Sequence, residues 1–108
     1  MAQVFKNAGQ VLTTSAEPIY TVPALTTAIV IGCQVTNVGT SAYNLSLSWL
    51  DSSDANAETY LAQAIPVPDA AAYEPIGGKL VLEAGDVIRG FASSNSALEV
   101  TVSVLEIS

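Results

Sequence analysis

Few side chains in this sequence are of a type that performs acid–base, nucleophilic or metal chemistry. There is no His, one Cys, three basic residues and ten acidic residues among 108. Three groups are nevertheless candidates for a chemical role: a run of oxygen-bearing residues, a pair of acidic residues and the lone cysteine. Each also has an ordinary structural role.

The oxygen-rich run comprises Asp51, Asp54, Asn56 and Glu58. Carboxylate and amide oxygens are the ligands that Ca²⁺ prefers, so the run could offer a cation site on a loop. However, it lacks the glycine and the ligand spacing of an EF-hand loop. We therefore interpret the run as a solvated loop and predict no metal site.

The acidic pair is Glu83 and Asp86, which could act as acid and base across a cleft. The two residues flank Ala84 and Gly85 in what reads as a tight hairpin turn. Acidic residues are common in such turns as solvent-exposed side chains. We expect no catalysis from this pair.

Cys33 could be a nucleophile only if a neighbouring His or a cluster of positive charge lowered the pKa of its thiol. The sequence contains no His. Alternation places Cys33 between Ile31 and Val35 on an apolar strand face, where a cysteine behaves as a small hydrophobic residue. We predict a core position, and the sequence as a whole predicts a protein without catalytic residues or a cofactor, and not an enzyme.

Aromatic side chains offer one binding hypothesis. Tyr43 and Trp49 could form a platform for a sugar ring, as in small carbohydrate-binding modules. Both share a predicted strand face with Leu45 and Leu47, which favours burial in the core. Carbohydrate binding therefore stays an alternative.

The elements that must position these residues are predicted to be strands, because apolar and polar residues alternate with period two. A strand is expected over about Thr26–Val38, with one apolar face that includes Ile29, Ile31, Cys33 and Val35. After a polar turn, alternation resumes from Tyr43 to Trp49. We expect these two strands to pair as an antiparallel hairpin.

The last third of the sequence predicts three further strands, at 79–82, at 87–92 and from Leu98 to Val104. The first two should pair around a turn in which Gly85 takes a positive φ. Two weaker candidates, Gln10–Thr14 and Pro18–Val22, precede the long strand.

The middle segment, Asp51–Gly78, is the least regular part and is expected to form loops. Within it, Glu58–Ile65 is compatible with a strand or with a short helix. Its prolines should interrupt regular structure; they are Pro66, Pro68 and Pro75.

Together these segments predict an all-β fold, an antiparallel β-sandwich of jelly-roll or immunoglobulin-like type with about eight strands. The length suits one domain. We assign residues 17–108 to the sandwich, and residues 1–16 to an N-terminal arm and first short strand of the same domain.

The charge balance excludes several partners. A net charge of −7 disfavours nucleic acid and an anionic membrane surface, both of which require clustered positive charge. No segment resembles a signal peptide or a membrane span, so we expect a soluble protein made in a cytoplasm. Only 12% of residues are charged, and charge depletion is typical of surfaces that other subunits cover.

Three segments resemble small virion structural proteins of tailed bacteriophages. They are Ile19–Ala24 (IYTVPA), the strand from Thr27 that ends at Asn37-Val38-Gly39, and Gly78–Ile88 (GKLVLEAGDVI). The resemblance covers about residues 17 to 107. Its motifs are structural, and none of their residues is catalytic.

The resemblance implies a virion protein assembled in the cytoplasm of a bacterial host. A capsid decoration (cement) subunit that binds across capsid subunits is the leading interpretation. The alternatives are a tail, baseplate or fibre component and a carbohydrate-binding adsorption module. The implied partners are the major capsid protein or other virion proteins, together with further copies of this chain, a trimer included.

Two segments are expected to make the contacts, the N-terminal arm from Met1 to about Val11 and the loop from Asp51 to Tyr73. The side chains predicted to anchor the interface are Val4, Phe5, Lys6, Tyr60 and Tyr73.

Overall fold

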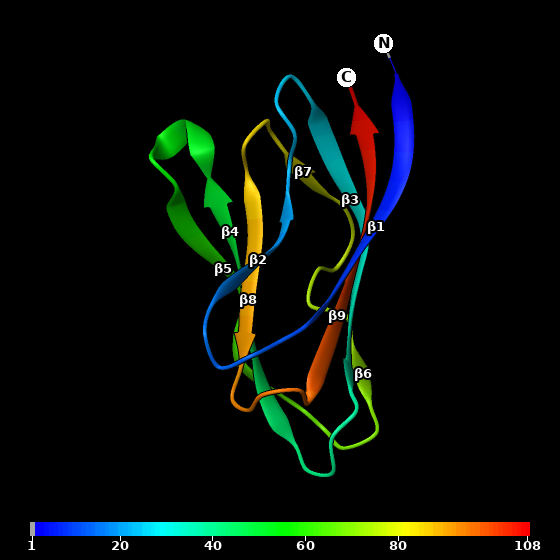
Figure 1. Cartoon of the computed structure of the whole chain (residues 1–108), viewed down its shortest axis with the longest axis vertical. Helices are drawn as coiled ribbons and strands as arrows, with labels where there is room; N and C mark the ends of the chain where they lie inside the picture. The colour runs from blue at the N-terminus through cyan, green and yellow to red at the C-terminus, as the bar shows by residue number, and fades with distance from the viewer. Residues whose placement is uncertain (1) are drawn as a thin grey trace.

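Two antiparallel β-sheets lie face to face in the computed structural model, which describes residues 2–108 (Figure 1). The strands are β1 (Gln3–Val11), β2 (Glu17–Thr21), β3 (Thr27–Asn37), β4 (Tyr43–Asp51), β5 (Ala57–Val67), β6 (Ala72–Tyr73), β7 (Leu80–Leu82), β8 (Val87–Ala92) and β9 (Leu98–Ile107). A 3₁₀ turn, η1 (Ser52–Asp54), follows β4. The predicted all-β sandwich is therefore confirmed.

Sheet A has the strand order β1-β9-β3-β6, and β7 pairs with another part of β3. Sheet B has the order β2-β8-β4-β5. Most connections lead from one sheet to the other, and among the strands of residues 2–108 only β4 and β5 form a hairpin between neighbours in sequence. The first and last strands lie side by side, so the two ends of the described chain meet at the top of Figure 1.

The core lies between the sheets and is built by the inward face of each strand. On β9 the predicted alternation is confirmed, because Leu98, Val100, Val102 and Val104 are all buried. These side chains pack against apolar residues of both sheets, chiefly Leu12, Val30, Val35, Leu45, Leu47, Val67, Leu82 and Ile88. Burial of apolar area is the main force that holds two sheets together.

The predicted hairpin between β3 and β4 is wrong. β3 pairs with β9, whereas β4 pairs with β5 and β8 in the other sheet. The buried Asn37 fixes this crossing: its side-chain nitrogen donates to the carbonyl oxygens of Ser41 and Val67, at 2.8 and 3.0 Å, and its oxygen accepts from the Gly39 amide. A turn held in this way carries the chain across the sandwich.

The predicted hairpin between β7 and β8 is wrong for the same reason. β7 joins β3 in sheet A and β8 joins β2 and β4 in sheet B. The turn itself forms as predicted, with a φ of +84° at Gly85 and a hydrogen bond from the Asp86 amide to the Glu83 carbonyl oxygen. It makes a corner between sheets and does not close a hairpin.

A β-bulge at Ile31 breaks the single apolar face predicted for β3. In the register with β9, Val30 lies opposite Val104 and Gly32 opposite Ser103, so Ile31 is the extra residue. Such a residue shifts the side-chain phase by one. As a result Val30 and Cys33 both face the core, while Ile31 is exposed.

The middle segment is more regular than expected. β5 is an eleven-residue strand with irregular register against β4, so the strand alternative for Glu58–Ile65 is confirmed and the general expectation of loops is wrong for residues 57–67. Pro66 is accommodated because β5 is the edge strand of sheet B and its outer side needs no backbone donor.

The N-terminal segment also differs from the expectation. A strand was predicted at Gln10–Thr14, whereas β1 spans Gln3–Val11 and pairs with β9 over its whole length. Met1 lies outside the described residues. Within residues 2–108 there is no helix of the length and apolar character needed to cross a bilayer.

Candidate functional site

The five predicted interface residues do not form one patch. Val4, Phe5 and Lys6 lie on β1, at one edge of sheet A, and are exposed. Tyr73 lies on β6 at the other edge of that sheet, and Tyr60 lies on β5, the edge strand of sheet B. All five are accessible to a partner, but only the three on β1 are neighbours.

The outward face of sheet A carries a row of apolar side chains that crosses four strands. Phe5 lies directly opposite Leu105, Leu105 opposite Ile29, and Ile29 opposite Val81. Residues directly opposite each other share a face of the sheet. Phe5 is 72% exposed and Val81 60%, and the two central residues are partly exposed.

This face is almost free of charge. Its side chains on β1, β9, β3 and β7, taken from the register, are Gln3, Phe5, Asn7, Gly9, Val11, Glu99, Thr101, Ser103, Leu105, Ile107, Thr27, Ile29, Gln34, Thr36 and Val81. Glu99, near one end, is the single charged residue among these positions of the described strands. We call this surface the outer face of sheet A.

An open groove of about 530 Å³ adjoins the apolar row. Its floor is formed by β3 and β9, and its wall by the segment between β6 and β7. The lining residues include Ile31, Gln34, Ile76, Thr101 and Ser103, with Glu74 and Lys79 at the wall. The groove widens the contact surface and contains no aromatic side chain that could stack on a sugar.

Glu106 connects the two sheets near the chain ends. It lies on the buried face of β9. One carboxylate oxygen accepts a 2.6 Å hydrogen bond from the hydroxyl of Tyr20 on β2. The other oxygen lies 3.0 Å from Nζ of Lys6 on β1. These two contacts lower the pKa of Glu106, and burial together with the carboxylate raises the pKa of Tyr20. Lys6 remains exposed, and its charge is paired with that of Glu106.

On sheet B, an ion pair joins Arg89 of β8 to Glu58 of β5. The Nη2–Oε2 distance is 2.6 Å, and the hydroxyl of Ser48 donates to the same oxygen. Hydrogen bonds from Arg89 and then Ser48 lower the pKa of Glu58. Glu58 thus has a structural partner and does not join Asp51 in a cation site.

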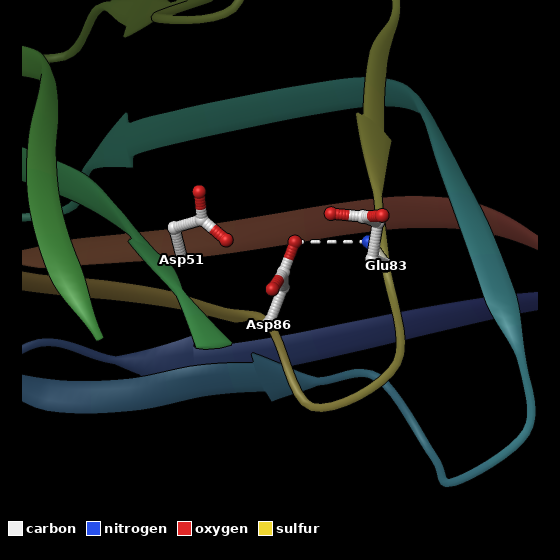
Figure 2. Close-up of side chains that lie close together, drawn as sticks. All are labelled: Asp51, Glu83 and Asp86. Carbon is white, nitrogen blue, oxygen red and sulfur yellow. Dashed lines mark hydrogen bonds between the residues drawn. The ribbon is translucent and has the colours of Figure 1, made fainter. Parts of the chain in front are cut away.

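Three carboxylates meet at the corner between β4, β7 and β8 (Figure 2). They belong to Asp51, Glu83 and Asp86, and one oxygen of each lies within 4.8 Å of the others. The residues of the oxygen-rich run do not form this cluster. Only Asp51 of that run lies here, beside the acidic pair Glu83 and Asp86. Three clustered carboxylates are of the type that a hard cation accepts as ligands.

Asp86 is the centre of this acidic corner and is only 1% exposed, so its prediction as a solvent-exposed turn residue is wrong. One oxygen accepts from the Ser52 amide and hydroxyl, and the other from the Glu83 amide and the Trp49 indole nitrogen, at 2.8 to 3.2 Å. Burial alone would raise the pKa of Asp86, but these donors outweigh it and lower the pKa. Both carboxylate oxygens of Asp86 therefore already accept hydrogen bonds from groups of this chain.

Cys33 and Trp49 both face the core, as the alternation predicted, but Trp49 is only partly buried. Cys33 is buried, and burial raises the pKa of its thiol to about 11, which leaves it unreactive. Trp49 and Tyr43 are partly buried and pack against the core. The indole N–H of Trp49 donates to Asp86, so the ring is held in the corner.

The apolar row on the outer face of sheet A was not predicted from the sequence. The signal was present in part, because Leu105 and Ile107 are apolar at positions where β9 should turn polar side chains to solvent. It could not be assembled, because the row depends on which strands are neighbours. The central role of Asp86 was not predicted either, because its hydrogen-bond partners come from three separate elements.

Comparison with known proteins gives structural likeness without sequence kinship. No protein-family model and no curated protein sequence match the chain. A chain from the acid-stable capsid of Helicobacter pylori bacteriophage KHP30 superposes with a TM-score of 0.60 at 12% identity, covering 100% of this chain and 94% of that one.

Two further solved structures are similar to a comparable degree. A protein of the Bacillus endospore appendages, which form a family of disulfide-linked pili, has a TM-score of 0.61 at 10% identity, over 99% of this chain and 87% of the other. The Drosophila NLP core, a pentamer-forming and histone-binding protein, has a TM-score of 0.54 at 12% identity, over 99% and 98%. At such identities the likeness establishes the sandwich fold alone.

Proposed function

We propose that this chain is a non-enzymatic bacteriophage virion protein, specifically a capsid decoration subunit that stabilises the head by binding across neighbouring capsid subunits. The observation that carries the proposal is the outer face of sheet A. This face presents an exposed apolar row in a field of uncharged polar side chains. Depletion of charge with exposed apolar and aromatic residues is typical of the centre of a protein interface.

The size of this face is close to that of a specific contact. Three strands about 4.8 Å apart and about nine residues long, with the short β7 beside them, cover roughly 480 Å², so a partner of equal area would give about 960 Å² in total. That is close to the roughly 1,000 Å² that a specific interface normally requires. The adjoining groove offers a recess for a protruding side chain of the partner.

Two more observations support a virion role. The motifs of residues 19–24, 27–39 and 78–88 resemble small phage structural proteins, and the fold is like that of a chain from a phage capsid. We also infer that the sandwich is a jelly roll. The orders β1-β9-β3-β6 and β2-β8-β4-β5 interlock two Greek keys, an arrangement found in viral capsid domains.

A carbohydrate-binding role has less support. It requires an exposed aromatic ring surrounded by polar groups, whereas Trp49 packs against the core and donates its N–H to Asp86. A tail, baseplate or fibre component is the second candidate. The likeness to a pilus protein favours it, because that protein belongs to an endospore appendage.

Electron cryomicroscopy of purified virions that carry this chain would test the proposal directly. Density for the sandwich on the outer surface of the head, bridging at least two capsid subunits, is the expected result. Density confined to the tail or fibre would overturn the decoration role and favour the second candidate.

A stabilisation assay would test the mechanism. Heads that lack this chain should unfold at a lower temperature, and addition of purified protein should restore their stability. A ligand at about 100 times its dissociation constant stabilises its target by roughly 2.7 kcal/mol per site, provided that it binds only the assembled state. Binding without any change in the melting temperature would contradict the cementing mechanism.

A further inference from the structure

The free edge of β1 is a second feature with the properties of a binding surface. β1 is the terminal strand of sheet A, and among residues 2–108 no strand pairs with its outward side. Ala2 exchanges two backbone hydrogen bonds with Ser108, which follows β9, and the Leu12 amide donates to the Leu98 carbonyl oxygen. In an antiparallel ladder such pairs alternate, so the even-numbered residues of β1 bond to β9.

The odd-numbered residues therefore direct their N–H and C=O groups away from the sheet. They are Gln3, Phe5, Asn7, Gly9 and Val11. A row of unpaired backbone groups of this kind is a template for another strand.

This edge has few of the features that normally prevent strand addition. Proteins protect edges with prolines, bulges or charged side chains. β5, the edge of sheet B, has Pro66 and shifts of register against β4. β1 has a regular register over nine residues, no proline, and one charged side chain, Lys6, which is paired with Glu106.

The sequence of β1 is complementary to itself in antiparallel orientation. If Asn7 lies on a two-fold axis, all nine residues of β1 pair with β1 of a second copy. The odd-numbered residues of the two strands, whose N–H and C=O groups point outward, then lie opposite one another. In that register Phe5 lies opposite Gly9 of the second copy. An aromatic ring that covers a cross-strand glycine is a known stabilising pair at sheet edges.

Charge also favours a second copy. Each chain carries a net charge of −7, so two copies can approach closely only where acidic side chains are absent. β1 contains no acidic residue, and its single basic residue lies opposite Ala8 of the second copy in this register. Like charges are therefore not placed opposite each other.

We propose that β1 pairs with β1 of a second copy about a two-fold axis through Asn7, joining two sheets A into one continuous sheet. The proposal is independent of the virion role. The contact is small, because one strand edge is only about 31 Å long. We therefore expect association at high protein concentration or within an assembly, where local concentration is high.

Sedimentation velocity on the full chain, from about 10 µM to about 1 mM, covers the range expected for such a small interface. The wild type should shift from monomer to dimer. Asn7→Pro removes the central outward N–H without removing a bond to β9, and should raise the dissociation constant by about tenfold or more. Asn7→Ala is the matched control, since both variants lose the 2.6 Å hydrogen bond from Ser103 to the Asn7 side chain, and it should dimerise like the wild type.

Disulfide trapping tests the register. Paired residues on the axis have Cα atoms about 5.5 Å apart, within the range that a disulfide spans. Asn7→Cys should therefore cross-link under mild oxidation, whereas Lys6→Cys, displaced from the axis, should not. Cys33 is buried and contributes no background.

Several results would overturn the proposal. They are a monomer or a trimer at about 1 mM, equal association of the Asn7→Pro and Asn7→Ala variants, or cross-linking through Val81→Cys in place of Asn7→Cys. The last result would indicate stacking of two outer faces of sheet A. Each variant's thermal unfolding is measured alongside, so that loss of folding is recognised and a less disruptive variant, Gly9→Pro, takes its place.

Discussion

At Asp86, one buried carboxylate accepts four hydrogen bonds from three different elements of the fold. The partners are the start of η1, the turn after β7 and the indole of Trp49 on β4. A buried charge is tolerated only when its partners replace the lost hydration. The acidic corner therefore acts as a clamp between the two sheets at one end of the sandwich.

We predict that Asp86→Asn destabilises the protein by about 2 to 4 kcal/mol, measured by urea unfolding. The amide NH₂ would face donors that now bond to a carboxylate oxygen, which leaves buried N–H groups unsatisfied. Asp54→Asn is the control, because Asp54 is exposed and should change stability by less than about 0.5 kcal/mol. Equal stability of the two variants would contradict the clamp.

Three carboxylates, Glu58, Asp86 and Glu106, have a pKa below the ordinary value in the folded state. Their ordinary values are 3.8 for Asp and 4.5 for Glu. Below these values the unfolded chain binds more protons than the folded one, so stability decreases as the pH falls through this window. Above about pH 5 these groups should contribute no slope.

We predict that the free energy of unfolding falls between about pH 5 and pH 3 and that Tyr20→Phe reduces this fall. Without the Tyr20 hydroxyl, the pKa of Glu106 moves towards its ordinary value. The contribution of Glu106 to the pH dependence of the free energy of unfolding then becomes smaller. The measurement is chemical unfolding at a series of pH values. An unchanged acid slope in Tyr20→Phe would show that the hydrogen bond does not hold the Glu106 carboxylate in its charged form.

At the scale of elements, the bulge in β3 decides which side chains reach the core. Before it, Ala28 and Val30 face inward, and after it Cys33 and Val35 do. An uninterrupted strand would place these two sets on opposite faces. The extra residue, Ile31, is thus the reason that both ends of β3 contribute to the core.

We predict that deletion of Ile31 leaves the fold intact and changes stability by less than about 2 kcal/mol. Its neighbours, Val30 and Gly32, already lie opposite consecutive residues of β9, so deletion restores a regular ladder. Deletion of Gln34 is the contrasting variant: it reverses the phase of the following residues and should prevent folding. Circular dichroism and thermal unfolding distinguish the two outcomes.

At the scale of the whole molecule, one of the two outward surfaces differs from the rest of the chain. The outer face of sheet A has an exposed apolar row and one charged side chain. Sheet B instead carries the Arg89–Glu58 ion pair on its outer side. We therefore assign the proposed capsid contact to sheet A.

We predict that Val81→Lys weakens binding to decoration-free heads by about tenfold or more while changing the free energy of unfolding by less than about 0.5 kcal/mol. Val81 is largely exposed, so the lysine costs little in the free protein, but its charge must be desolvated in a contact. Asp54→Lys, on η1, serves as the control for added positive charge. Equal binding by the two variants would remove sheet A from the interface.

The amino-acid sequence by itself determined the all-β class, most strand positions and the burial of Cys33, Leu45, Leu47 and alternate residues of β9. These properties are local, since period two records which side chains share a face of one strand. The charge balance, which disfavours nucleic acid as a partner, also follows from composition alone.

Only the tertiary structure decided which strands are neighbours, and with them the sheet assignments of β4 and β8, the acidic corner and the apolar row. The same alternation is compatible with a hairpin and with a crossing between sheets, because either arrangement buries the same face. The choice depends on contacts between residues far apart in sequence, such as Asn37 with Val67 and Trp49 with Asp86. A local pattern contains no record of such contacts.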